Sequence, residues 1–141
     1  AVSARSGETL KLYHNARNSG GHSVDQSWSE QRAAEADFET TTSISLADLL
    51  ERIGCESVDL LKCDIEGSEY DAFLAADRET LSRMEVHVSE TYPPQRLLDL
   101  IDHLSTAGFS VKLDRDMPTT TETQARMLYA DHTGRAAAKA A

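Results

Sequence analysis

The chain has 141 residues, enough for one domain with its own core. Its 40% hydrophobic and 27% charged residues are typical of a globular protein, and its net charge of −10 disfavours binding to nucleic acid or an anionic membrane surface. No apolar run approaches the roughly 20 residues of a membrane span. Cys55 and Cys63 form neither a disulfide framework nor a zinc motif, so we expect a soluble, cytoplasmic protein.

The first third of the chain predicts two strands separated by polar segments. Alternating apolar and polar residues at Thr9–Tyr13 indicate a half-buried strand, and the β-branched run at Phe38–Ile44 indicates a second one. Turn-forming residues fill Asn15–Gly21, which predicts a loop. The polar segment Ser27–Ala36 is expected to be irregular and exposed.

Helix and strand signals alternate from Ser45 onward. Ser45 and Asp48 resemble a capping box for a helix whose apolar face runs to Ile53, and Gly54 supplies the stop. The next predicted elements are a strand at Val58–Cys63, a helix capped by Ser68, a strand at Met84–Ser89, a helix from Pro93-Pro94 to Gly108, and strands at Phe109–Leu113 and Arg126–Ala130.

Nearly continuous apolar strands separated by helices indicate a parallel sheet that is covered on both faces. We therefore expect an α/β fold with a doubly wound (Rossmann-like), mostly parallel sheet and an antiparallel C-terminal edge. The predicted domain spans residues 1–131, and a disordered Ala-rich tail follows at residues 132–141.

Acidic residues follow two of the predicted strands. Asp64 comes after the strand that ends at Cys63, and Glu90 comes after the next strand. Ligands bind beyond the carboxyl ends of strands in open parallel sheets, and consecutive strands are usually neighbours, so both carboxylates should face one crevice. Glu66 lies at the turn, which Gly67 allows to fold tightly. A bound cation or an abstracted proton would relieve the repulsion between the acids.

Structural interpretations of these residues stay open. Asp and Glu are common helix caps, although Ser68 already fills that position, and the helix dipole accounts for Glu69 and Asp71. Lys62 is a candidate ion-pair partner for one of the strand-end acids. His87 is more often a buried core residue than a base.

The segment VDLLKCDIEGSEYDAF, at Val58–Phe73, resembles the signature of FkbM-type S-adenosylmethionine-dependent methyltransferases. In that family a strand ends in Lys-x-Asp-x-Glu-Gly-x-Glu before a helix. Further segments that resemble the family in the same order are Ala1–Ser3, Thr9–Tyr13, Asn18–Ser23, Ile44–Leu50 and Val88–Glu90. The family's glycine-rich turn and ribose-binding acid would lie upstream of Ala1. The resemblance, from Ala1 to about Leu113, therefore implies a partial class I methyltransferase domain, truncated at the N-terminus.

The resemblance implies transfer of a methyl group from S-adenosylmethionine to a hydroxyl of a sugar or natural product. Asp64 is the first candidate for lining the sulfonium or activating the hydroxyl, with help from Glu90, while Glu66 would orient the acceptor or the turn. A second version places Mg²⁺ between Asp64 and Glu90, where it would lower the pKa of the hydroxyl. Ala1 and Val2 are candidates for a position near the adenine of the cofactor.

Other interpretations remain beside this one. His14, Asn15, Asn18 and His22 are candidate contacts to the acceptor, but they are also ordinary turn residues. A non-catalytic α/β binding module would use the same crevice without chemistry. A metal-dependent hydrolase would use the strand-end acids, with Asp114-Arg115-Asp116 as its only further support. The sequence identifies neither the acceptor nor the oligomeric state.

Overall fold

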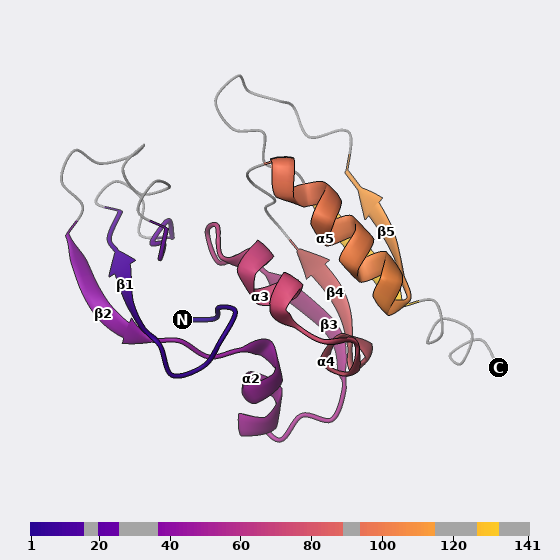
Figure 1. Ribbon diagram of the computed structural model, residues 1–141, viewed down its shortest axis with the longest axis horizontal. Coiled ribbons are helices and arrows are strands. Elements are labelled where there is room, and N and C mark those ends of the chain that lie inside the picture. Colours follow the sequence, from indigo (N-terminus) through magenta and orange to yellow (C-terminus); the bar gives the residue numbers. More distant parts are fainter. Residues whose placement is uncertain (16–19, 26–36, 89–93, 115–126, 133–141) are drawn as a thin grey trace.

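The computed structural model describes residues 1–15, 20–25, 37–88, 94–114 and 127–132. These residues form two separate sheets, with the helices packed beside the larger one (Figure 1). In chain order the elements are β1 (Thr9–Tyr13), β2 (Phe38–Thr42), α2 (Leu46–Arg52), β3 (Val58–Cys63), α3 (Glu69–Ala75), α4 (Arg78–Ser82), β4 (Met84–Val88), α5 (Pro94–Ala107), β5 (Phe109–Leu113) and β6 (Leu128–His132).

The smaller sheet is an antiparallel ribbon of β1 and β2, which lies to one side of the helices in Figure 1. Both strands were predicted from their residue patterns. A two-stranded ribbon is marginally stable alone, so its side-chain contacts matter. The rings of Tyr13 and Phe38 lie 5.8 Å apart, and the Lys11 ammonium lies 4.2 Å from the Phe38 ring centre. A parallel bridge between Val2 and Ile44 joins the N-terminal segment to the chain that follows β2.

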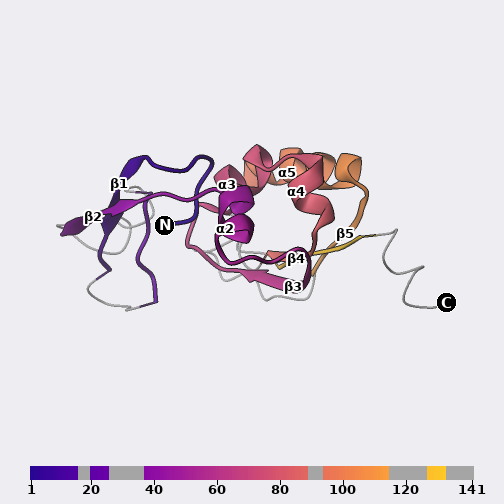
Figure 2. The same cartoon turned by 90° about the horizontal axis from the view of Figure 1, so that it is seen from below.

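The larger sheet has the strand order β3-β4-β6-β5, and the predicted doubly wound, mostly parallel sheet is wrong. Only β3 and β4 pair in parallel among the described strands, while β4–β6 and β5–β6 are antiparallel. Helices α3, α4 and α5 all lie on the same face of this sheet (Figure 2). The antiparallel pairing of the last two strands was predicted, although β6 starts at Leu128 and ends at His132.

The exposure of β3 explains why the prediction failed. Its apolar run suggested a strand covered on both faces, yet Leu60 is 59% exposed. Leu61 and Cys63 pack against the core, which lies on the helix side of the sheet. An apolar run shows that a strand has a buried face, but it does not distinguish one covered face from two.

The ends of the predicted helices lie close to the capping residues in the sequence. The Ser45 hydroxyl accepts a hydrogen bond from the Asp48 backbone N–H at 3.2 Å, as the capping pattern predicted. Ile53, expected on the apolar face of α2, instead caps the helix and is 61% exposed. Helix α4 was not predicted because it has only five residues; Asp77 begins it by accepting from the Thr80 N–H at 2.8 Å.

The core lies between the helices and the larger sheet. Its largest apolar side chains that are essentially inaccessible to solvent are Tyr70, Phe73, Leu81, Met84, Leu100, Leu104 and Leu128. Of the predicted tail, only His132 is described, and it ends β6. The predicted excursion at Ser27–Ala36 lies outside the described residues.

Candidate functional site

The turn between β3 and α3, residues 64–68, has a strained backbone, and we call it the signature turn. Glu66 has φ of 55° and Gly67 has φ of 105°. Glu66 is the one residue other than glycine with positive φ among the described residues. A side chain in this region of φ costs roughly 1–2 kcal/mol, so surrounding contacts must hold the turn.

Glu69 holds the signature turn from the helix side. Its two carboxylate oxygens accept hydrogen bonds from the backbone N–H groups of Ile65 at 2.7 Å and Gly67 at 2.8 Å. The residue is only 1% exposed. Burial raises the pKa of Glu69, while the hydrogen bonds from the backbone act in the opposite direction. The sequence analysis attributed Glu69 to the helix dipole alone and did not predict these two hydrogen bonds, which we call the brace by Glu69.

Ser23 holds the signature turn from the opposite side. Its hydroxyl donates to the Glu66 carbonyl oxygen at 2.5 Å and accepts from the Asp25 N–H at 3.0 Å. Backbone hydrogen bonds of 2.8 and 3.2 Å tie Ser23 to Tyr13 at the end of β1. The loop at residues 20–25 is therefore fastened to both β1 and the signature turn.

The structure places two of the three predicted catalytic acids. Asp64 forms an ion pair with Lys62, with 2.9 Å between Oδ2 and Nζ, and its side chain is 41% exposed. Glu66 lies at the strained position of the turn and is half-buried. The tips of β3 and β4 are adjacent, with Cys63 in register with Val88, as predicted for consecutive strands. Glu90 lies outside the described residues, so the roles of these acids stay predictions.

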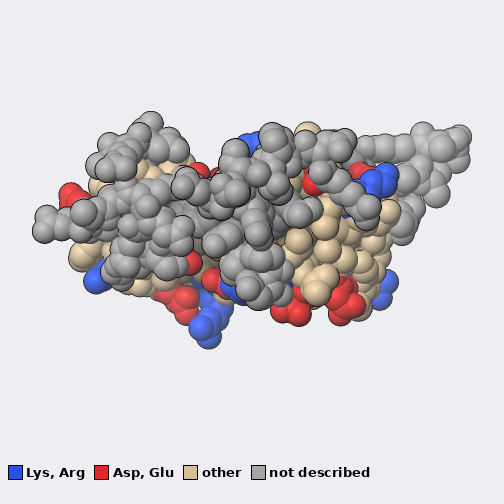
Figure 3. Space-filling model, turned by 90° about the horizontal axis from the view of Figure 1, so that it is seen from above, with Lys and Arg blue, Asp and Glu red and all other residues tan. Residues whose placement is uncertain are grey.

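The Lys62–Asp64 pair resembles the other ion pairs on the surface. Figure 3 shows acidic and basic side chains interspersed along one edge of the described surface. The Arg96–Asp71 pair, at 2.7 Å with an Asp71 side chain that is 51% exposed, is a close counterpart. Exposed pairs of this kind contribute about 0–1 kcal/mol, so the ion pair of Asp64 adds little to stability.

The predicted Mg²⁺ site has no support from the described residues. Among them, no group of three or more His, Cys, Asp or Glu side chains is arranged to hold a metal ion. The Asp64 carboxylate is already engaged by Lys62, and Glu90, its predicted partner, is not described. We therefore derive no step through a metal. The hydrolase interpretation stays untested, because Glu90, Arg115 and Asp116 lie outside the described residues.

A cavity of about 210 Å³, which we call the turn cavity, borders the signature turn. Its lining residues are Ala1, Val2, Leu12, His22, Val24, Thr41, Ile65 and Ser68. Ala1 and Val2, the two residues predicted to lie near the cofactor, thus face the same space as Ile65 and Ser68. Pockets for drug-sized ligands have roughly 300–1,000 Å³, so this cavity fits one part of such a ligand. Its wall is mostly apolar with a few polar groups, as is usual for small-molecule sites.

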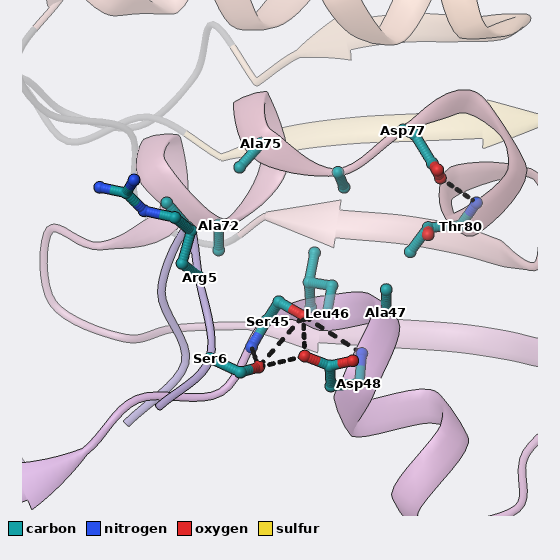
Figure 4. A pocket seen from close by; sticks show the side chains of 12 residues that line it. Arg5, Ser6, Ser45, Leu46, Ala47, Asp48, Ala72, Ala75, Asp77 and Thr80 are labelled. Atoms are coloured by element: carbon teal, nitrogen blue, oxygen red, sulfur yellow. Dashed lines mark hydrogen bonds between the residues drawn. The ribbon is translucent and has the colours of Figure 1, made fainter. Parts of the chain in front are cut away.

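A larger cavity of about 320 Å³ lies toward the other end of α3 (Figure 4). Asp48 accepts hydrogen bonds there from the hydroxyls of Ser6 and Ser45, and Asp77 accepts from Thr80. These bonds lower the pKa of Asp48 and of Asp77. Both acids are therefore ionised and poor proton acceptors, so this cavity offers less for activating a hydroxyl.

Cys63 lies at the end of β3 and is 6% exposed. Burial raises the pKa of its thiol to about 12; the charges of Glu69 and Asp64 add to this effect and Lys62 opposes it. The thiolate is the reactive form of cysteine. Cys63 is therefore a core residue and not a nucleophile.

We expect the two thiols to react at very different rates with a disulfide reagent at pH 8. The half-buried Cys55 should react with the native protein, and Cys63 on the order of a thousandfold more slowly until the protein unfolds. Timed labelling with mass spectrometry would measure both rates, and Cys55→Ser should remove only the fast phase. Equal rates in the native protein would contradict the buried position of Cys63.

Gly67→Ala should destabilise the protein and disturb the site. A Cβ at Gly67 has room, with its nearest neighbour at 3.8 Å, so the cost comes from its φ of 105°. We expect the free energy of unfolding, measured in urea, to fall by about 1–2 kcal/mol. Gly54→Ala is a matched control because Gly54 also has positive φ, 64°, and lies outside the signature turn. It should cost similar stability without lowering the activity of the protein; an equal loss of activity in both variants would contradict a local role for Gly67.

One comparison with known proteins assigns the chain to a family. The family model described as the methyltransferase FkbM domain matches residues 2–111, which include the signature turn and the loop at residues 20–25. This match defines the class of protein as a methyltransferase. The chain belongs to the FkbM methyltransferase family, as the sequence resemblance predicted. Searches of curated proteins and of solved structures found no match.

No helix in the described part of the chain is both long and apolar enough to span a bilayer.

Proposed function

We propose that this protein is an S-adenosylmethionine-dependent O-methyltransferase whose acceptor is a hydroxyl of a sugar or natural product. Family membership supports the methyltransferase class. The proposed location of the site rests on the signature turn. Glu69 and Ser23 hold this strained backbone against a cavity that Ala1 and Val2 also line.

Positioning is the main contribution expected of the chain. Methyl transfer is an in-line displacement, in which fixed geometry supplies much of the rate. When bound, S-adenosylmethionine would supply the activated methyl group. The turn cavity would hold one end of a ligand between the N-terminal segment and Ile65 and Ser68.

The acceptor hydroxyl must also lose a proton. In this proposal Asp64 receives it or faces the positive sulfonium, Glu90 assists and Glu66 orients the acceptor. The partial exposure of the Asp64 side chain, 41%, leaves it accessible to a substrate. We further propose a cytoplasmic location, which the unlinked thiols of Cys55 and Cys63 support.

Calorimetry with S-adenosylhomocysteine and the full-length gene product tests this function. We expect saturable binding, and transfer of a labelled methyl group from S-adenosylmethionine to hydroxyl acceptors such as methyl glycosides. The transferred label should resist mild base, because a methyl ether does not hydrolyse as a methyl ester does. Absence of both binding and transfer would overturn the proposal and favour a non-catalytic binding module.

A further inference from the structure

His22 lies at the edge of the site and has no role in the proposed chemistry so far. It belongs to the loop at residues 20–25, which lies between β1 and the start of α3 in Figure 1. The adjacent Ser23 fastens this loop to the Glu66 carbonyl. His22 itself lines the turn cavity together with Ile65 and Ser68. Its position is therefore set by the same contacts that hold the signature turn.

The hydrogen bond of the His22 ring defines its chemistry. Nδ1 lies 3.0 Å from the backbone N of Asn15 and accepts the hydrogen bond of that N–H. A neutral imidazole has one nitrogen that accepts and one that carries a proton. Since Nδ1 accepts, Nε2 carries the proton and can only donate. In this arrangement His22 cannot remove a proton from a hydroxyl, but it can bind an oxygen.

A contact with the His14 ring, outside the cavity, restricts the position of the His22 ring. The rings of His14 and His22 lie 5.1 Å apart at an angle of 53°. His14 also pairs with Glu39, with 3.6 Å between Nε2 and Oε1. His14 does not line the turn cavity. It therefore supports the His22 ring without facing a ligand.

We propose that His22 binds the ligand of the turn cavity by donating a hydrogen bond from Nε2 to a ligand oxygen. The mostly apolar wall selects a small molecule, or a part of one, that carries such an oxygen beside apolar groups. Both the methyl donor and the methyl acceptor offer this chemistry. The inference rests on the proposed function, which places substrate binding at this cavity.

The tautomer is tested without any ligand. Nitrogen-15 NMR of histidine-labelled full-length protein at pH 8 distinguishes a protonated ring nitrogen from an unprotonated one. We expect His22 to show a proton on Nε2 and none on Nδ1, and His22→Gln identifies its signals. A proton on Nδ1 would overturn the proposal.

Ligand binding is tested with three variants. His22→Ala removes the donor, His22→Gln restores an N–H near the position of Nε2, and His14→Gln is the control on the neighbouring ring. If the oxygen belongs to the methyl donor, His22→Ala should weaken S-adenosylhomocysteine binding about tenfold, while the other two variants stay within about threefold. If it belongs to the acceptor, S-adenosylhomocysteine binding stays constant, and His22→Ala raises the KM for methyl glycosides about tenfold.

The remaining outcomes count against the proposal. Binding and KM that are insensitive to His22→Ala would overturn it and leave the proposed function standing. If no glycoside is methylated and His22→Ala does not change the binding of S-adenosylhomocysteine, the proposal for His22 is also overturned and the proposed function still stands. Wild-type protein that binds no S-adenosylhomocysteine and transfers no methyl group would overturn both. Circular dichroism of each variant confirms that it is folded before binding is compared.

Discussion

Asp64→Asn is expected to abolish measurable methyl transfer, a loss of about a hundredfold or more, while the melting temperature stays nearly unchanged. The side-chain amide of Asn cannot accept the proton of the acceptor hydroxyl. General base catalysis typically contributes about 10²–10⁴ in rate. The structural cost is small because the carboxylate forms an exposed ion pair with Lys62. Labelled methyl transfer and thermal unfolding monitored by circular dichroism measure the two effects separately.

Asp71→Asn is the matched control for this prediction. Asp71 is also an exposed, ion-paired aspartate, held by Arg96 at 2.7 Å, and it lies in α3, outside the signature turn. Its replacement should change neither activity nor melting temperature appreciably. If Asp64→Asn instead lowers the melting temperature strongly and activity falls in proportion, Asp64 belongs to the scaffold and not to the chemistry.

Glu69→Ala is expected to lower the free energy of unfolding by about 2–4 kcal/mol. It leaves the N–H groups of Ile65 and Gly67 without their carboxylate acceptor, and each unsatisfied buried donor costs about 1–3 kcal/mol. Part of this cost is regained because a buried charge is removed. Urea unfolding of the variant and the wild type measures the difference.

Asp71→Ala is the control for Glu69→Ala, since both acids lie in the first turn of α3. Asp71 is exposed, so its loss should cost less than about 1 kcal/mol. Equal effects of the two replacements would contradict the brace and restore the helix dipole as the role of Glu69.

The contribution of Glu69 should also depend on pH. Burial raises its pKa above the ordinary value of 4.5, so the folded state holds the proton more tightly than the unfolded state. The associated stability is fully present below pH 4.5 and is lost as pH rises through the raised pKa. The cost of Glu69→Ala should therefore be smaller at pH 8 than at pH 4. A cost that increases with pH would contradict the raised pKa.

Local signals in the sequence predicted most of the element boundaries. The strands at Thr9–Tyr13 and Val58–Cys63 lie where alternation and apolar runs placed them. Ser45 caps α2 with its hydroxyl, whereas Ser68 occupies the N-cap position of α3 without a side-chain cap bond. These features depend on neighbours in the chain, which sequence patterns describe well.

Features that depend on distant contacts were harder to predict. Whether a sheet is covered on one face or two depends on how helices pack, and nothing in the run at β3 indicated that Leu60 would be exposed. The brace by Glu69 needs a tightly folded turn around Gly67, which only the backbone geometry reveals. A glutamate two residues after a turn glycine is the one signal that pointed to it.

The location of the site stays a prediction. The sequence indicated the end of β3 as its centre, and the family match over residues 2–111 supports the methyltransferase class without locating the site. It did not show that the loop at residues 20–25 packs against the signature turn, because Ser23 and Glu66 are 43 residues apart. His22 was therefore indistinguishable from an ordinary turn residue.

Hydrogen exchange of the full-length protein, with and without S-adenosylhomocysteine, tests the location of the site most directly. The account predicts slower exchange in peptides that cover residues 64–68 and 20–25 when the ligand is bound. Slower exchange confined to residues 45–48 and 75–80, which line the larger cavity of Figure 4, would contradict it.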